Sequence, residues 1–117
     1  MVRDRVEVDR VAEHVWVVAL RGEHDLTTAD AVRGAIDEVF AEGSRVVLDL
    51  SDATFIDSTM VATVIVEHSH ARHEANDEFV VVAPPDSPAR HLFDLTGVDQ
   101  VVNVYENRQT ALAAVSR

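Results

Sequence analysis

The chain has 117 residues, the size of one ordinary domain, and a chain of this length buries roughly two-thirds of the surface that it exposes when unfolded. Its 21 Asp and Glu residues outnumber its 10 Lys and Arg residues, which gives a formal net charge of -11. This charge opposes binding to nucleic acid or anionic membranes and favours a partner with a basic protein surface. The absence of cysteine excludes disulfides, thiolate metal sites and thiol nucleophiles.

The amino-terminal residues indicate where the protein is found. Residues 1–7 alternate charged side chains with valine and contain no apolar core of a signal peptide. The longest apolar runs, residues 15–20 and 79–85, are far shorter than the roughly 20 residues that a membrane-spanning helix requires. We therefore expect a cytoplasmic protein with no direct membrane insertion.

The first part of the chain predicts a β-hairpin, a loop and a helix. Residues 6–11 and 15–20 are valine-rich and flank a short polar segment, which is typical of two paired strands. A glycine and several polar groups then interrupt the pattern, so residues 21–25 are predicted to be a loop. Residues 27–30 match a helix-capping pattern, apolar residues recur after them at helical spacing, and Gly43 is predicted to end this helix.

The middle of the chain predicts a buried strand and a second helix. Residues 45–50 are an apolar run typical of a strand covered on both faces, and residues 51–54 are predicted to turn away from it. Residues 58–75 are rich in β-branched side chains, which would also suit a strand. We interpret them as a helix because the segment is long for a strand and begins at Asp57 and Ser58, a natural helix start. Four side chains would then share one face: Val61, Val64, Ile65 and His68.

The last part of the chain predicts two strands and two helices. Residues 79–83 form another buried strand, and Ser87 followed by proline predicts the start of a short helix that ends at Gly97. Residues 101–105 are predicted to be the last strand. Asn107 is predicted to cap a final helix. That helix would pack through three apolar residues: Ala111, Leu112 and Val115.

The predicted order of elements is ββαβαβαβα. Strands that alternate with helices after an opening hairpin are typical of the α/β class, in which crossover helices cover a mixed, mostly parallel β-sheet. No repeat, linker or low-complexity segment divides the chain. Residues 1–117 are therefore predicted to form a single domain.

The residues give little support for an enzyme. The four glycines are scattered, which excludes the common phosphate-binding loops. His68, His70 and His73 are the obvious candidate metal ligands, but on a helix His68 and His70 point roughly 200° apart, so we expect no metal site. Ser58 lacks the glycine-flanked turn and the evident base of a hydrolase triad. We expect no catalytic residue and no cofactor.

The candidate functional segment is Asp57, Ser58 and Thr59, where Phe55 and Ile56 lead into the predicted second helix. The simplest interpretation is structural, with the Ser58 hydroxyl accepting a backbone hydrogen bond as the helix N-cap. The functional interpretation is a phosphorylation switch. A phosphate on Ser58 would add about 1.5 to 2 negative charges at a helix start, where the exposed N–H groups tolerate them. The fold would then survive while a docked partner is repelled.

Three segments together resemble the STAS domain, a family that includes anti-sigma factor antagonists and the cytoplasmic tails of sulfate transporters. The resemblance covers essentially the whole chain. Its segments are residues 21–25 (Arg-Gly-Glu-His-Asp), residues 46–50 (Val-Val-Leu-Asp-Leu) leading through residues 54–58 (Thr-Phe-Ile-Asp-Ser), and residues 90–98 (Arg-His-Leu-Phe-Asp-Leu-Thr-Gly-Val). The middle segment is the most specific of the three.

The resemblance implies a non-enzymatic regulator of transcription. In the antagonist branch the unphosphorylated domain binds a serine-kinase anti-sigma factor, which releases a sigma factor. That kinase phosphorylates the residue matching Ser58, and a phosphatase resets the antagonist. By resemblance Asp57 shapes the phosphorylation site, Glu23 and Asp25 lie in the loop beside it, and Thr59 is the second candidate acceptor. The expected partner-binding residues are Glu23, Asp25, Asp57, Thr59, Met60 and Val61.

Met60 departs from the family pattern, which usually has glycine at this position. We expect Met60 either to narrow the approach to the Ser58 hydroxyl or to provide a different apolar contact. Two other interpretations stay open. One is a subunit that docks constitutively on a transporter or signalling assembly without being phosphorylated, and the other is a ligand-binding or degenerate module.

Overall fold

The computed structural model describes residues 6–40, 45–73 and 77–116, and its described strands form one five-stranded sheet. The elements in chain order are β1 (Val6–Ala12), β2 (Val15–His24), α1 (Leu26–Phe40), β3 (Arg45–Ile56), α2 (Ser58–Arg72), β4 (Glu78–Val82), α3 (Pro88–Thr96), the 3-10 turn η1 (Val98–Gln100), β5 (Val104–Tyr105) and α4 (Arg108–Val115). β1 pairs antiparallel with β2, and β2 to β5 run parallel in the order of the sequence. The predicted fold class and the order ββαβαβαβα are confirmed.

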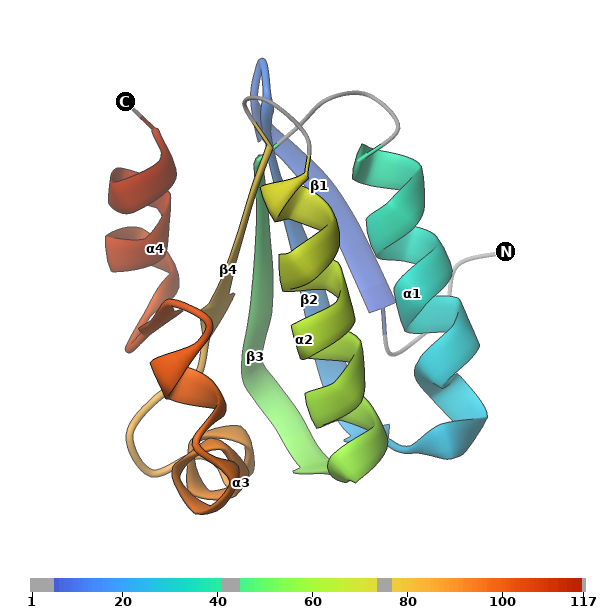
Figure 1. Ribbon diagram of the computed structural model, residues 1–117. Coiled ribbons are helices and arrows are strands. Elements are labelled where there is room, and N and C mark those ends of the chain that lie inside the picture. Colours follow the sequence, from blue (N-terminus) through green and yellow to red (C-terminus); the bar gives the residue numbers. More distant parts are fainter. Residues whose placement is uncertain (1–5, 41–44, 74–76, 117) are drawn as a thin grey trace.

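Helices cover both faces of the sheet, as Figure 1 shows, with α1, α2 and α3 on one side and α4 on the other. Alternate residues of β3 and β4 therefore enter different cores. Val46, Leu48 and Leu50 pack with the three helices of the first face, whereas Val47 packs with α4. Burial on both faces explains why these strands are continuous apolar runs instead of alternating patterns.

Two side-chain contacts attach α4 to the sheet. Arg108 Nε donates to Asp49 Oδ2 at 2.8 Å, and Asp49 is buried on β3. Arg45 Nη1 donates to the carbonyl oxygen of Val115 at 2.7 Å, so a strand residue binds the last turn of the helix. Asp49 also accepts hydrogen bonds from the backbone N–H and hydroxyl of Ser51. The aspartate in the Val-Val-Leu-Asp-Leu segment thus holds α4 in place.

The strands β2 and β3 are longer than predicted. Residues 21–24 were expected in a loop and residues 51–54 in a turn, but both segments continue the parallel pairing, with Gly22 opposite Ala53 and His24 opposite Ile56. The register shifts twice along this extension, and Gly22 has a φ of 77°, which favours glycine. Several of the extension's side chains are exposed, so the sequence there has the polarity of a loop.

The helix termini largely follow the predicted caps. Ser87 Oγ accepts from the Arg90 N–H at 3.1 Å, with proline as the first helical residue of α3, and Gly97 ends that helix with a φ of 76°. Asn107 Oδ1 accepts from the Thr110 N–H at 2.8 Å and caps α4. The predicted end of the first helix at Gly43 lies outside the described residues.

Two predictions at element ends were wrong. The helix α1 begins at Leu26, ahead of the predicted capping segment 27–30, and the Asp25 carboxylate accepts from the Thr27 N–H at 2.8 Å. The strand β5 spans only Val104–Tyr105 instead of residues 101–105, because Val98–Gln100 form a 3-10 turn first. Short apolar runs do not distinguish a strand from a turn that packs on the core.

Helix α2 is a helix, as predicted, from Ser58 to Arg72, and residues 74–76 of the predicted span lie outside the described part. Its buried residues are Met60, Val61, Thr63, Val64, Glu67 and Ala71. The predicted apolar face was partly wrong, because Ile65 is exposed and His68 is only half-buried.

No helix in the described ranges is long and apolar enough to span a membrane.

Candidate functional site

The candidate site lies where β2 and β3 end and where α1 and α2 begin. Parallel neighbouring strands end at the same edge of a sheet, and here Glu23 lies opposite Phe55 and His24 opposite Ile56. Ser58 is the first residue of α2, directly after this edge. In Figure 1 the starts of α1 and α2 lie together at the lower end of the sheet. The fold thus brings the predicted residues of two distant segments, 23–25 and 57–59, to one edge.

Asp57 is the N-cap of α2, and not Ser58 as the structural interpretation held. Its backbone is extended, its carboxylate accepts from the Thr59 N–H at 3.0 Å, and its carbonyl oxygen accepts from the Met60 N–H at 3.0 Å. A carboxylate at this position also interacts favourably with the positive end of the helix dipole. Ser58 is therefore not required for capping, and its side chain is exposed.

Asp57→Ala is expected to lower the free energy of unfolding by about 1 kcal/mol, because the substitution removes the cap from α2. Asp57→Asn should retain most of the stability, since asparagine is an equally good N-cap residue. Ser58→Ala should change stability by less than about 0.5 kcal/mol, as for most surface substitutions. Urea denaturation of the four proteins checks this order, and a larger loss for Ser58→Ala than for Asp57→Ala would contradict the assignment of the cap.

Thr59, the second candidate acceptor, is less accessible than Ser58. It is half-buried, its N–H binds the Asp57 carboxylate, and its carbonyl oxygen accepts from the Thr63 hydroxyl at 3.0 Å. Ser58 thus presents the more accessible hydroxyl of the two.

A buried histidine supports the segment that carries Glu23 and Asp25. The His24 ring is fully buried, with Nε2 3.0 Å from the carbonyl oxygen of Arg21 and Nδ1 3.1 Å from the Thr28 hydroxyl. These contacts tie the end of β2 to the first turn of α1. Glu23 is exposed and Asp25 is half-buried on either side of His24, at the edge next to Ser58.

Met60 and Val61 are placed in the core and not on the partner surface. Met60 is 1% exposed and Val61 is also buried, and both belong to the cluster between the sheet and its helices. The Met60 side chain therefore neither narrows the approach to the Ser58 hydroxyl nor offers an apolar contact to a partner. Helix geometry explains this placement, since Met60 and Val64 are four residues apart and lie on one face of α2.

The sequence reasoning missed two exposed apolar side chains at this edge. Leu26 is the first residue of α1 and is 75% exposed, and Phe55 on β3 is also largely exposed. Apolar side chains next to acidic groups are typical of protein-binding surfaces, whose centres are apolar and whose rims are polar. No local pattern distinguishes these two residues, because Phe55 and Leu26 follow the same apolar patterns as core residues.

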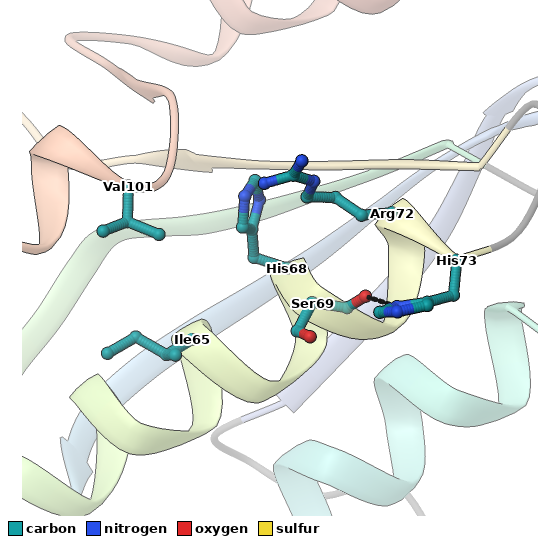
Figure 2. Close-up of a pocket in the computed structure, with 6 residues that line it drawn as sticks. All are labelled: Ile65, His68, Ser69, Arg72, His73 and Val101. Atoms are coloured by element: carbon teal, nitrogen blue, oxygen red, sulfur yellow. Dashed lines mark hydrogen bonds between the residues drawn. The ribbon is translucent and has the colours of Figure 1, made fainter.

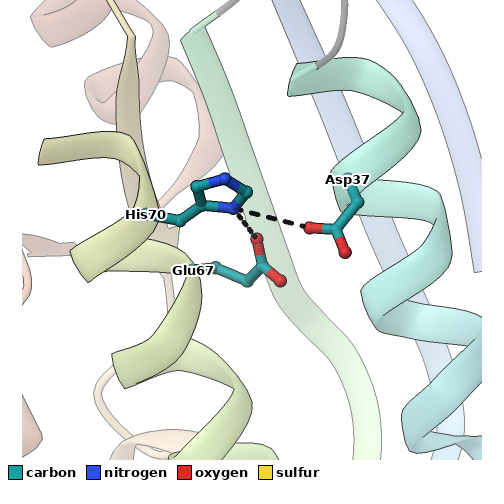
Figure 3. A group of neighbouring side chains, drawn as sticks. All are labelled: Asp37, Glu67 and His70. Carbon is teal, nitrogen blue, oxygen red and sulfur yellow. Dashed lines mark ion pairs between the residues drawn. The ribbon is translucent and has the colours of Figure 1, made fainter. Parts of the chain in front are cut away.

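Helix α2 carries a buried acidic residue, Glu67, whose burial the sequence analysis did not predict. Its side chain is buried between α1 and α2, near Asp37 and His70 (Figure 3). Burial, followed by the hydrogen bond and charge of Asp37, raises the pKa of Glu67 from 4.5 to about 8, against the opposing effect of the Arg33 charge. The carboxyl group of Glu67 is therefore largely protonated at neutral pH.

This pKa predicts that stability decreases as the pH rises. The folded protein holds the Glu67 proton more tightly than the unfolded chain, so the stabilising contribution is complete below pH 4.5 and is lost as the pH rises through about 8. We expect the loss to be on the order of 1 kcal/mol per pH unit within this interval. In chelator-treated samples, Glu67→Gln should flatten the dependence of stability on pH, whereas Glu38→Gln, an exposed change on α1, should not. Parallel profiles for wild type and Glu67→Gln would refute the prediction.

An open pocket of about 330 Å³ lies along the second half of α2. Its lining includes Ile65, His68 and Arg72 from α2 and Val101 from the segment before β5, all labelled in Figure 2. Burial, and then the nearby Arg72 charge, lowers the pKa of His68 below its ordinary value. This pocket is separate from the Ser58 edge, because about ten helical residues, or roughly 15 Å, lie between Ser58 and His68.

Comparisons with known proteins point to one family. The family model of the STAS domain matches residues 7–111. The anti-sigma-F factor antagonist RsfB of Mycobacterium tuberculosis is 34% identical over 108 residues, which cover 90% of this chain and 86% of RsfB. The anti-sigma F factor antagonist of Paenibacillus polymyxa is 27% identical over 100 residues, which cover 84% of each chain.

Solved structures agree with these relatives. The crystal structure of an anti-sigma factor antagonist from Mycobacterium paratuberculosis superposes with a TM-score of 0.85 at 31% identity, covering 96% of this chain and 93% of that one. The antagonist SpoIIAA in its unphosphorylated form superposes with a TM-score of 0.76 at 18% identity, covering 95% and 96%. At 18% identity, the similarity to SpoIIAA shows a shared fold and nothing about function.

Proposed function

Because the chain belongs to the STAS domain family, we propose that it is an anti-sigma factor antagonist that binds a serine-kinase anti-sigma factor while Ser58 is unphosphorylated. Phosphorylation of Ser58 by that kinase ends the interaction, and a phosphatase restores it. The observation that carries this proposal is the exposed Ser58 hydroxyl at the start of α2, where Asp57 performs the capping. Because the Ser58 hydroxyl is not needed to cap α2, it is available for phosphorylation.

The start of α2 is suited to accept a phosphate without loss of the fold. The first backbone N–H groups of a helix have no partner within the helix, and the helix dipole places partial positive charge there. Asp57 already accepts from two of these N–H groups, those of Thr59 and Met60. The helix dipole still favours added negative charge at Ser58, so phosphorylation changes the surface charge more than the fold.

The partner surface proposed here combines apolar and acidic groups. Leu26 and Phe55 supply exposed apolar area, and Glu23, Asp25 and Asp57 supply negative charge around Ser58. With the net charge of -11, this composition fits a partner that is basic around an apolar centre. The chain contributes the docking surface and the acceptor hydroxyl, while the kinase supplies the catalytic groups and ATP.

The test is a competition experiment with serine-kinase anti-sigma factors from the same organism. Each purified kinase is loaded with its sigma factor, and the unphosphorylated chain is added in increasing amounts. The proposal predicts that one kinase binds the chain and releases its sigma factor. If every kinase retains its sigma factor, the antagonist function is refuted. A chain that binds its partner equally well before and after phosphorylation would instead be a constitutive docking subunit.

A further inference from the structure

A buried carboxylate, an exposed carboxylate and an imidazole converge between α1 and α2. His70 Nδ1 lies 3.9 Å from Asp37 Oδ1 and 4.0 Å from Glu67 Oε2, and one ligand atom from each residue lies within 4.8 Å of the others. Figure 3 shows the three side chains directed toward one another across the space between the helices. The histidine spacing along the sequence did not reveal this group, because Asp37 belongs to the other helix.

Glu67 is the residue that requires an explanation. It is 1% exposed, and its Oε2 atom has no hydrogen-bond partner among the described residues. A buried polar atom without a partner destabilises a protein. An apolar side chain would suit this position on α2 better if packing were its only role. The unpartnered oxygen faces Asp37 and His70, which indicates a ligand for that space.

We propose that Asp37, Glu67 and His70 bind a divalent transition-metal ion of the zinc class, which links α1 to α2. One imidazole nitrogen and two carboxylate oxygens suit Zn²⁺, whereas Mg²⁺ and Ca²⁺ prefer oxygen ligands alone. The ion's two positive charges balance the two carboxylates. Water completes the coordination on the open side. This site is independent of the proposed function, because it does not involve Ser58.

The geometry requires only small movements of exposed side chains. Metal–ligand distances near 2.0 to 2.2 Å in a tetrahedral site place the ligand atoms about 3.4 Å apart, somewhat closer than they are here. The side chains of Asp37 and His70 are 48% and 56% exposed and can close this gap around the buried Glu67. Arg33, one turn before Asp37, is the nearby positive charge that opposes the ion.

The experiment is calorimetric titration of the chelator-treated full chain with ZnCl₂ and, separately, with MgCl₂. We expect saturable 1:1 binding of Zn²⁺ and at least tenfold weaker binding of Mg²⁺. Asp37→Asn and His70→Gln should each weaken Zn²⁺ binding at least tenfold. Both positions are exposed, so these variants should fold even if Glu67→Gln does not. A hundredfold excess of Zn²⁺ over the wild-type dissociation constant should raise Tm by about 10 °C in the wild type, but by about 6 °C or less in Asp37→Asn and His70→Gln.

The matched controls remove the same chemical groups elsewhere. Asp30→Asn takes an exposed carboxylate from α1, and His91→Gln takes an exposed histidine from α3. Both should bind Zn²⁺ within twofold of the wild type. The proposal is overturned if the wild type shows no saturable Zn²⁺ binding, or if Asp37→Asn and His70→Gln bind as tightly as the controls do.

Discussion

Met60→Ala is expected to lower the free energy of unfolding by about 2 to 5 kcal/mol, and Met60→Gly by roughly 1 kcal/mol more. The reason is that Met60 is 1% exposed and packs in the main core, so truncation leaves a cavity below the first turn of α2. Domains of this size are stable by about 5 to 15 kcal/mol, so the glycine variant loses a large part of the total. Urea denaturation measures the loss.

Ala62→Gly is the matched control for the backbone effect. Ala62 is exposed on the same helix, so glycine there should cost about 1 kcal/mol from helix propensity without creating a cavity. A similar loss for Met60→Gly and Ala62→Gly would contradict the burial of Met60. The buried Met60 side chain thus makes the fold, and not the partner surface, the main target of Met60→Gly.

Ser58→Asp is expected to weaken binding of the anti-sigma factor by about tenfold, and phosphorylation of Ser58 by about a hundredfold. If the otherwise basic partner surface places one carboxylate about 6 Å from Ser58, that carboxylate repels a single charge by roughly 1.4 kcal/mol and a phosphate by about twice that, at an effective dielectric constant near 40. The added charge lies at the helix start, so both forms should remain folded. Calorimetry with the cognate kinase gives the affinities.

Ser58→Asn is the control that separates charge from shape. Asparagine matches aspartate in size and is neutral, so it should bind within about threefold of Ser58→Ala. Equal affinities for Ser58→Asp and Ser58→Asn would contradict a switch based on charge. Because Asp57 provides the cap, none of these variants should lose the N-terminal turn of α2.

Local signals in the sequence predicted the elements that depend on local chemistry. The apolar runs predicted the strands, and Ser87, Gly97 and Asn107 were predicted at helix ends where the structure has them. The parallel sheet followed from the alternation of strands and helices. The strands and the helix caps depend on residues within one or two turns of each other, which is the distance over which capping and periodicity act.

Features that depend on contacts between distant segments could not be predicted in this way. The extensions of β2 and β3 form because the two strands pair with each other, although their sequences are polar. The inward direction of Met60 depends on how α2 rotates against the sheet. The approach of Glu67 to Asp37 depends on the packing of α2 against α1. To predict any of these three features, one must know where a second helix or strand lies, and a local sequence pattern does not contain that information.

The most direct test of the proposed switch is intact-mass spectrometry with peptide mapping, after incubation of the chain with ATP and each serine-kinase anti-sigma factor of its organism. The proposal predicts one added phosphate on Ser58 with the cognate kinase and none on the Ser58→Ala variant. No added phosphate with any active kinase, or phosphate only at another residue, would contradict the assignment of Ser58 as the switch.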